Sequence, residues 1–349
     1  MEAWSEEVNV ARKATIKDVA GAAGVSIATV SRYLNGSIRL PGSTTKRIDH
    51  AVASLRYAPN PLARSLSLGK SNTIGLVVPE IGNPFFAGLA ASVETAAAEH
   101  GLGVLLCVTL NRVERELDYI GRLEHRQVDG LLFATNHPDD GTLLAALAGL
   151  PGIVLLDEDI AGADVAGVFA DNMNGARDAT RHILEAGHRR IAMLSGPSGL
   201  LSAEERRRGF LSAVREGGAQ ALAVMEGAYS REAGERATER LLSEHPETTA
   251  IFTGSDEIFL GMLQVFRRRG IRIGRDISVV TCDDVEPLSL FEPPITALRQ
   301  DLDLLARQAL RLVTVDIART PLKAEQVRVP MELQVRQSVS SPRRRVKLS

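Results

Sequence analysis

The sequence predicts an N-terminal all-α helix-turn-helix headpiece followed by a much larger α/β body. Two short helical patterns meet at Gly24-Val25-Ser26, which indicates the headpiece. From Thr73 onward, short apolar runs alternate with longer amphipathic runs, a pattern typical of parallel sheets covered by helices on both faces. The charge divides the chain at the same place: residues 12–70 carry ten Lys or Arg against two Asp, a net charge of +8, and the rest of the chain totals −10.

The headpiece pattern begins with two capped helices. The first helix is expected to start after Thr15, whose hydroxyl can accept a backbone N–H, and to end at Gly24. Ser26 should cap a second helix that runs to about Leu34 and presents a small, polar and basic face suited to the major groove of DNA. A generic helical hairpin is the alternative interpretation. A third helix is expected at 43–55, and a fourth at 61–69 that is too short to be stable alone and could fold only on DNA.

The body contains seven apolar runs that we interpret as strands, about the number that two parallel sheets need: 73–78, 103–108, 130–133, 152–155, 191–194, 250–252 and 277–280. Parallel sheets bind ligands beyond the carboxyl ends of their strands, so two facing lobes would form a binding cleft. Polar or aromatic residues follow four of these strands and are the first candidates for that cleft: Asn83, Phe85, Phe86, Asp157, Ser255, Asp256 and Asp283.

Several classes of protein are excluded by what the sequence lacks. No apolar run approaches the length of a membrane span, and the first residues lack a secretion signal, so we expect a cytoplasmic protein. Cys107 and Cys282 lie in strand-like runs and are interpreted as buried thiols. Gly69-Lys70-Ser71 resembles the end of a phosphate loop, but Arg64 stands where that loop needs Gly. We therefore expect no enzymatic activity, no catalytic residues, no metal site and no cofactor.

Ordered motifs make the chain resemble the lactose-repressor/galactose-repressor (LacI/GalR) family of bacterial transcription regulators. The headpiece carries Thr15-Ile-Lys-Asp-Val-Ala20, Gly24-Val-Ser26, Thr29-Val-Ser-Arg32, Leu34-Asn-Gly36 and the run from Tyr57 to Leu66. The body adds Asn83-Pro-Phe-Phe86 and the run from Pro293 to Gln300, among others, so that the resemblance covers nearly all of residues 15–338. It implies a two-lobed, periplasmic-binding-protein-like body with two parallel sheets and three crossings between the lobes.

The resemblance also implies roles for particular residues. Ile27, Ala28 and Arg32 would read bases, and other headpiece residues would contact or support the DNA backbone: Thr15, Ser26, Thr29, Ser31, Asn35 and Arg39. Leu66, with Ala63 beside it, would enter the minor groove, although Leu66 could also pack between two hinge helices. In the cleft, Arg206 and Asp283 would hold ligand hydroxyls, Tyr229 and Phe85 would supply apolar faces, and Gln300 would add a hydrogen bond. The alternatives are that Arg206 pairs with a surface carboxylate and that Asp283 caps a turn.

The expected organisation follows from these assignments. Residues 1–14 form a disordered extension, 15–60 the DNA-binding domain, 61–70 a hinge helix and linker, 71–340 the effector-binding and dimerisation domain, and 341–349 a basic tail. Within the body, lobe 1 takes 71–170 and 301–325, and lobe 2 takes 171–300 and 326–340. Two positions depart from the family pattern: Ser255 replaces the usual Asn, and Arg56 replaces the usual Gly.

The function expected from the sequence is a transcriptional repressor. It would bind a pseudo-palindromic operator in double-stranded DNA as a homodimer, under the control of a small polar effector such as a sugar. The alternative is a cytoplasmic sugar-binding or sugar-metabolising α/β protein that does not bind an operator.

Overall fold

The computed structural model describes residues 14–58, 70–317 and 324–342. The chain divides into two compact units, Met1–Ser71 and Asn72–Ser349, which are described separately. The expectations for the extension at 1–13, the hinge at 61–69 and the tail at 343–349 fall outside the described residues.

Residues 14–58 of the first unit form three helices, α1 (Ile16–Ala23), α2 (Ile27–Leu34) and α3 (Gly42–Ser54). Their apolar faces meet in one small core whose fully buried members are Val19, Val30 and Ile48. Ala20, Ala23 and Ala51 complete this core. The sequence therefore predicts the existence and order of these helices correctly.

The end of α3 shows why Gly suits position 56, where this chain has Arg. Arg56 adopts a φ of +47°, in the left-handed region that favours glycine. The backbone N–H of Tyr57 then reaches back to the carbonyl of Val52 at 2.9 Å and closes the helix end. Arg56 therefore holds a conformation that costs a non-glycine residue roughly 1 kcal/mol.

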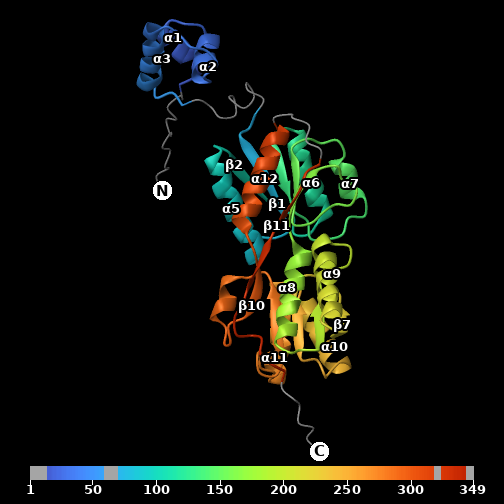
Figure 1. Cartoon of the computed structure of the whole chain (residues 1–349). Coiled ribbons are helices and arrows are strands. Elements are labelled where there is room, and N and C mark those ends of the chain that lie inside the picture. The colour runs from blue at the N-terminus through green and yellow to red at the C-terminus, as the bar shows by residue number, and fades with distance from the viewer. Residues whose placement is uncertain (1–13, 59–69, 318–323, 343–349) are drawn as a thin grey trace, which may run out of the picture. The chain divides into compact units, whose positions relative to one another are not determined.

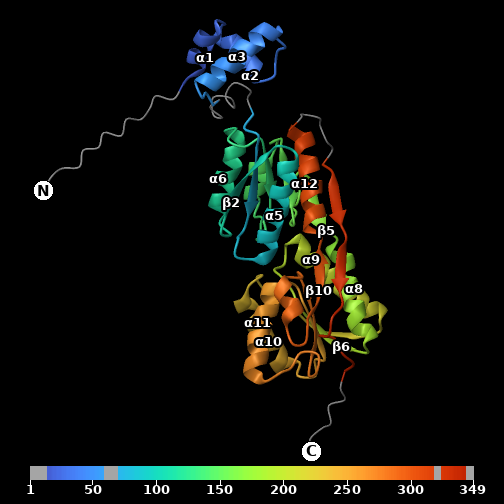
Figure 2. The ribbon, with the colours of Figure 1, turned by 90° about the vertical axis from the view of Figure 1, so that its left-hand side faces the viewer.

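The second unit consists of two lobes, each with a six-stranded sheet between two layers of helices (Figure 1, Figure 2). The sheet of lobe 1 has the order β11-β5-β4-β3-β1-β2 and is parallel throughout. Its strands are β1 (Thr73–Val78), β2 (Gly103–Val108), β3 (Gly130–Phe133), β4 (Ile153–Leu156), β5 (Ala166–Ala170) and β11 (Gln326–Val329).

The sheet of lobe 2 has the order β12-β10-β9-β8-β6-β7, and only β12 runs antiparallel to its neighbour. Its strands are β6 (Arg190–Leu194), β7 (Gln220–Met225), β8 (Ala250–Thr253), β9 (Ser278–Cys282), β10 (Thr296–Gln300) and β12 (Met331–Gln334). A short 3₁₀ helix, Glu286–Leu290, connects β9 to β10.

Helices cover both faces of each sheet. In lobe 1, α5 (Pro84–Glu99) and α12 (Leu302–Ile317) lie side by side on one face, as Figure 2 shows, and α6 (Val113–Glu124) and α7 (Thr142–Leu147) cover the other. In lobe 2, α8 (Asn172–Glu185) pairs with α9 (Leu201–Glu216) and α10 (Arg231–Glu244) pairs with α11 (Asp256–Arg269). Burial on both faces explains why β1, β4, β8 and β9 are almost continuously apolar.

The chain crosses between the lobes three times, after β5, after β10 and after β11. The third crossing corrects the expected boundary, because residues 326–329 were assigned to lobe 2. β11 pairs with β5 in lobe 1, and its Val327 and Val329 pack into the core of that lobe. Pro330 separates β11 from β12, so the lobe boundary lies between two strands of four residues that a single residue separates.

Candidate functional site

Local interactions set the start of α1, the turn that follows it at Gly24 and the start of α2. Thr15 and Asp18 form a capping box at the start of α1, in which the Thr15 N–H donates to Asp18 Oδ2 at 2.8 Å. Gly24 ends α1 with a φ of +61°. Ser26 Oγ then accepts the backbone N–H of Thr29 at 3.1 Å and caps α2. The turn at Gly24 and the cap at Ser26 fix where α2 begins, and therefore which of its residues point outward.

The outward face of α2 matches the interpretation as a reading helix. Ser26, Ile27, Ala28 and Arg32 are exposed, whereas Val30 on the opposite face is fully buried. Ile27 keeps 46% of its surface exposed, so its side chain is accessible to a partner. An exposed Ile beside an Ala can contact a thymine methyl group, and a nearby Arg can bond a guanine edge.

The remaining headpiece candidates lie around this face. Thr15 and Arg39 are exposed, and Thr29, Ser31 and Asn35 are partly buried. Tyr33 Oη donates to Asp49 Oδ1 at 2.9 Å, which ties α2 to α3 and raises the pKa of Tyr33. Ala63 and Leu66 lie outside the described residues, so their expected minor-groove role stays a prediction.

A cavity lies between the two lobes of the second unit, at the ends of several strands. Nine of the ten candidate effector residues line it: Asn83, Phe85, Phe86, Asp157, Arg206, Tyr229, Ser255, Asp283 and Gln300. The tenth, Asp256, is buried next to Ser255 at the start of α11 and is not part of the lining. Asn136 and Ser202 also line the cavity and were not identified from the sequence. Asn136 follows β3, so the rule about strand ends could have found it, whereas Ser202 lies within a helix.

Arg206 is the central cation of this cavity. It projects from α9 and is 97% buried, and its Nε donates to Asn172 Oδ1 at 2.8 Å. One of its terminal nitrogens donates to the carbonyl of Gly254 at 2.6 Å. Its guanidinium carbon lies 5.9 Å from the ring centre of Tyr229, within cation–π range. The alternative, a surface ion pair, is therefore inconsistent with where Arg206 lies.

Carboxylates surround this guanidinium. Asp157 follows β4 and Asp283 follows β9, and each has a φ of +66°. Such backbone conformations cost a non-glycine residue energy and cluster at functional sites. Gln300, at the end of β10, donates from Nε2 to Asp283 Oδ1 at 2.8 Å. Its Oε1 is buried and accepts no hydrogen bond from the described residues, so it is available to a donor in the cavity.

The protein environment shifts the titration of these carboxyl groups. Burial raises the pKa of Asp157 to about 6, with a contribution from Asp283 that opposes the effect of Arg206. Burial, together with Asp283 and Glu257, raises the pKa of Asp256 to about 7. The cavity therefore combines one fixed positive charge with several acceptors, a set that suits hydroxyl or N–H donors on a ligand.

The space between these side chains is small. The cavity measures about 30 Å³, roughly the volume of one water molecule in the liquid. A neighbouring cavity of about 340 Å³ shares Phe85, Asp283 and Gln300 with it. Ser255, the departure from the usual Asn, accepts the N–H of Ile258 at 3.2 Å and caps α11. Its hydroxyl hydrogen is still available to the cavity.

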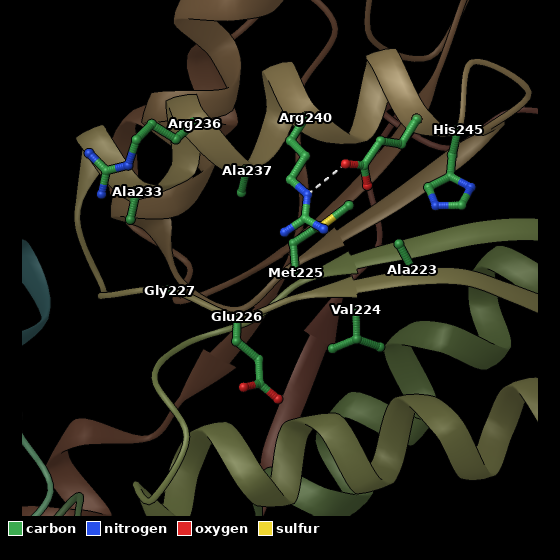
Figure 3. A pocket seen from close by; sticks show the side chains of 11 residues that line it. Ala223, Val224, Met225, Glu226, Gly227, Ala233, Arg236, Ala237, Arg240 and His245 are labelled. Carbon is green, nitrogen blue, oxygen red and sulfur yellow. Dashed lines mark hydrogen bonds and ion pairs between the residues drawn. The ribbon is translucent and has the colours of Figure 1, made fainter.

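A larger groove lies elsewhere, between β7 and α10 (Figure 3). It measures about 490 Å³, and its floor includes Ala223, Met225 and Ala237. Arg240 at its rim is paired with Glu244 on the same helix, with Nε 2.8 Å from Oε1. None of the candidate residues lies there, and it lacks the buried polar side chains of the interlobe cavity.

Within residues 14–58, 70–317 and 324–342, no group of three His, Cys, Asp or Glu side chains is placed to hold a metal ion. In the same part of the chain, no helix has the length and apolar character needed to span a bilayer.

Family models match both units of the chain. Residues 15–60 match the bacterial regulatory proteins of the lacI family, and residues 71–337 match the periplasmic binding proteins and sugar binding domain of the LacI family.

Curated relatives are similar over nearly the whole length. The transcriptional repressor PurR of Mannheimia succiniciproducens is 32% identical over 330 residues, which cover 93% of this chain and 98% of the relative. The ribose operon repressor of Halalkalibacterium halodurans is 34% identical and covers 93% and 96%.

Among solved structures, the Lac repressor dimer bound to operator and the anti-inducer ONPF superimposes with a TM-score of 0.82 at 28% identity. This match covers 94% of this chain and all of the other. The complex of the transcriptional regulator CelR with cellobiose gives a TM-score of 0.71 at 31% identity and covers 93% and 99%.

Proposed function

The chain belongs to the LacI family of bacterial regulatory proteins and is a DNA-binding transcriptional regulator, and we propose that it is a repressor whose operator affinity is controlled by a small polar effector. Two of the relatives carry the names ribose operon repressor and HTH-type transcriptional repressor PurR. The single observation that carries the effector proposal is the interlobe cavity, because it places nine of the ten candidate residues together.

The proposed DNA contacts use the exposed face of α2. Ile27, Ala28 and Arg32 would read base edges in the major groove, and the capped turn at Ser26 would lie against a phosphate. The Lac repressor that superimposes on this chain is a dimer bound to operator. We therefore propose a homodimer on a pseudo-palindromic site, with Leu66 as the minor-groove wedge.

The proposed effector contacts use the polar side chains of the cavity. Arg206 and Asp283 offer a planar donor and an acceptor that match neighbouring hydroxyl groups on a sugar-like molecule. Gln300 Oε1 would accept a further donor, and Phe85 and Tyr229 would contact the apolar faces of the ring.

Control of operator binding would come from movement of the lobes. The space between the site residues measures about 30 Å³, so a ligand of sugar size needs the lobes to part before it can contact all of them. β1 begins at Thr73, directly after the segment that links lobe 1 to the headpiece, so reorientation of lobe 1 moves the attachment points of two headpieces in a dimer. Effector and operator would then change each other's affinity by the same factor.

The protein would act by binding alone, as a regulator, with no catalytic step. It would work in the cytoplasm on the nucleoid, where operator DNA is found.

The proposal is tested by titrating the full-length protein with labelled genomic duplexes at several KCl concentrations. A repressor forms a discrete complex whose affinity falls steeply with salt, because basic side chains displace counterions from DNA. A panel of sugars, sugar phosphates and nucleobases is then screened by thermal shift, and each hit is added to the complex. A protein that binds a sugar but forms no discrete DNA complex would contradict the proposed function.

A further inference from the structure

A buried hydrogen-bond chain joins the two lobes beside the effector cavity. Glu158 follows β4 in lobe 1, Ser202 lies in the first turn of α9 in lobe 2, and Tyr229 follows β7. The Ser202 N–H donates to Glu158 Oε2 at 3.1 Å, and Ser202 Oγ is hydrogen bonded to Glu158 Oε1. Ser202 Oγ also lies 2.9 Å from Tyr229 Oη, and either oxygen can be the donor.

Glu158 takes the place of a helix cap. The residue before α9 is Leu200, which has no side chain that can accept a hydrogen bond. The carboxyl group of Glu158 accepts one of the N–H groups of the first turn instead. A residue of lobe 1 therefore caps a helix of lobe 2, and this contact is lost when the lobes part.

One end of this hydrogen-bond chain, at Glu158, is buried from solvent, and the other end, at Tyr229, opens to the cavity. Glu158 and Ser202 are each 1% exposed, whereas Tyr229 is partly exposed and lines the cavity. The charged and titratable groups that act on Glu158 are Asp157, Arg206 and Tyr229. Burial and the neighbouring Asp157 outweigh Ser202 and Arg206, so the pKa of Glu158 is raised to about 8.

We propose that Glu158 is a positioning residue for the effector site: through the hydroxyl of Ser202 it fastens the two lobes and decides whether the hydroxyl of Tyr229 donates or accepts a hydrogen bond in the cavity. The role of these three hydrogen-bonded residues in ligand selection rests on the proposed effector site, whereas their hydrogen-bond geometry is independent of it.

Two arrangements of hydrogens satisfy the three oxygen groups. When Glu158 is neutral, its O–H donates to Ser202 Oγ, the Ser202 hydroxyl donates to Tyr229 Oη, and the Tyr229 hydroxyl is free to donate into the cavity. When Glu158 is ionised, Ser202 donates to the carboxylate and Tyr229 donates to Ser202 Oγ. Tyr229 then offers the cavity only an acceptor. Near neutral pH the first arrangement prevails, so the cavity has a donor from Tyr229 next to Arg206 and selects ligands that present an acceptor there.

Lobe closure is coupled to the same proton. In an open cleft Glu158 faces water, and its pKa returns toward the ordinary value of about 4.3. At pH values between about 4.3 and about 8, closure of the lobes is therefore accompanied by uptake of a proton on Glu158. The contribution of Glu158 to closure is lost as pH rises through about 8.

The proposal can be tested without an effector by nuclear magnetic resonance on the full-length protein labelled with ¹³C in its tyrosine rings. The chain has only four tyrosines, so Tyr229→Phe identifies the Tyr229 signal by its loss. In the unmodified protein, the Tyr229 signal should move between pH 5 and 9.5 with a step near pH 8. Glu158→Gln should abolish that step, because the amide holds the neutral arrangement by donating to Ser202 Oγ.

Ser202→Ala distinguishes a chain of hydrogen bonds from a distant electric field. It removes the shared hydroxyl but leaves Glu158 in place, so the amplitude of the step should fall by more than half. Glu204→Gln is the matched control, because Glu204 lies two residues further along α9, pairs with Arg207, and should leave the step unchanged.

A step near pH 8 that persists in Glu158→Gln, or that keeps its full amplitude in Ser202→Ala, would overturn the proposal. If Glu158→Gln fails to fold, Ser202→Ala alone decides the question. Because the measurement uses neither DNA nor effector, its failure is distinguishable from failure of the proposed function.

Discussion

Replacing Arg206 with Met should destabilise the body by about 3–5 kcal/mol, because the change removes one side of a buried, charged hydrogen-bond network. Asn172 Oδ1 and the carbonyl of Gly254 would each lose a donor, at about 1–3 kcal/mol for each buried acceptor left unpaired. Asp157 and Asp283 would lose their nearby positive charge, although protonation of Asp157, whose pKa is already raised, limits its part of the cost. Met replaces most of the aliphatic stem, so lost packing adds little.

Urea unfolding of the full-length protein at pH 7, monitored by circular dichroism, measures this loss of unfolding free energy directly. Thermal unfolding measures the same loss as a lower melting temperature. A body of this size should melt roughly 2–4 °C lower for each kcal/mol lost, so Arg206→Met should lower the melting temperature by about 6–20 °C. Arg208→Met is the matched control, because Arg208 lies on the same helix with an exposed side chain and should change stability by less than about 1 kcal/mol. A loss below about 1 kcal/mol in Arg206→Met would refute the inference that this guanidinium is the electrostatic centre of the cavity.

Three further predictions concern other parts of the chain. Arg56→Gly should stabilise the headpiece by up to about 1 kcal/mol, because Gly adopts the left-handed φ without strain. Slower amide exchange in α1–α3 would detect this gain. Faster exchange would show that the Arg side chain stabilises the headpiece by more than the strain costs. Arg32→Ala should weaken binding to a selected operator by about 1–3 kcal/mol and relax preference at one base pair of each half-site, measured by fluorescence anisotropy on matched and mutated duplexes; a uniform loss on all duplexes would indicate a phosphate contact instead. Gly196→Ala should displace Tyr229, because a Cβ at this position would lie 2.2 Å from the tyrosine ring; a Tyr229 ¹³C signal unchanged from that of the unmodified protein would count against this packing.

Much of the fold follows from local signals in the sequence. The seven predicted strands are all present. Six of them are buried along most of their length, and strands buried on both faces are continuous apolar runs bounded by turns. The seventh, β2, lies at a sheet edge but is also a continuous apolar run after its first Gly. β5, β7, β10, β11 and β12 were not predicted. β7 and β12 lie at sheet edges with several half-exposed residues, and β10 carries a polar Arg and Gln at its end, so their patterns are weaker. β11 and β12 are separated only by Pro330, and nothing local indicates that they belong to different sheets.

The candidate effector residues were found for two reasons. Asn83, Asp157, Asp283 and their neighbours follow apolar strands, and parallel strands bring their carboxyl ends together at one edge. Arg206, Tyr229 and Gln300 came only from the family resemblance, because a helical Arg in a basic run looks like a solvated surface residue. Whether these residues bind an effector stays a prediction.

Glu158 and Ser202 could not have been identified from the sequence. The run Asp157-Glu158-Asp159 looks like an exposed acidic turn, yet its middle residue is buried and its neighbour Asp159 is exposed. The partner of Glu158 lies more than forty positions away in the other lobe, and this contact depends on how the two lobes pack. Such tertiary contacts leave no periodic trace in the chain.

We propose that the α2 faces of two paired headpieces together read a symmetric DNA site. Selection of duplexes from a randomised library by the full-length protein tests it most directly, because no operator need be known in advance. We expect enrichment of one pseudo-palindromic motif by the unmodified protein. With Arg32→Ala, enrichment should be lost at a symmetric pair of positions in that motif. A library that shows no enriched motif, or a motif without two-fold symmetry, would contradict it.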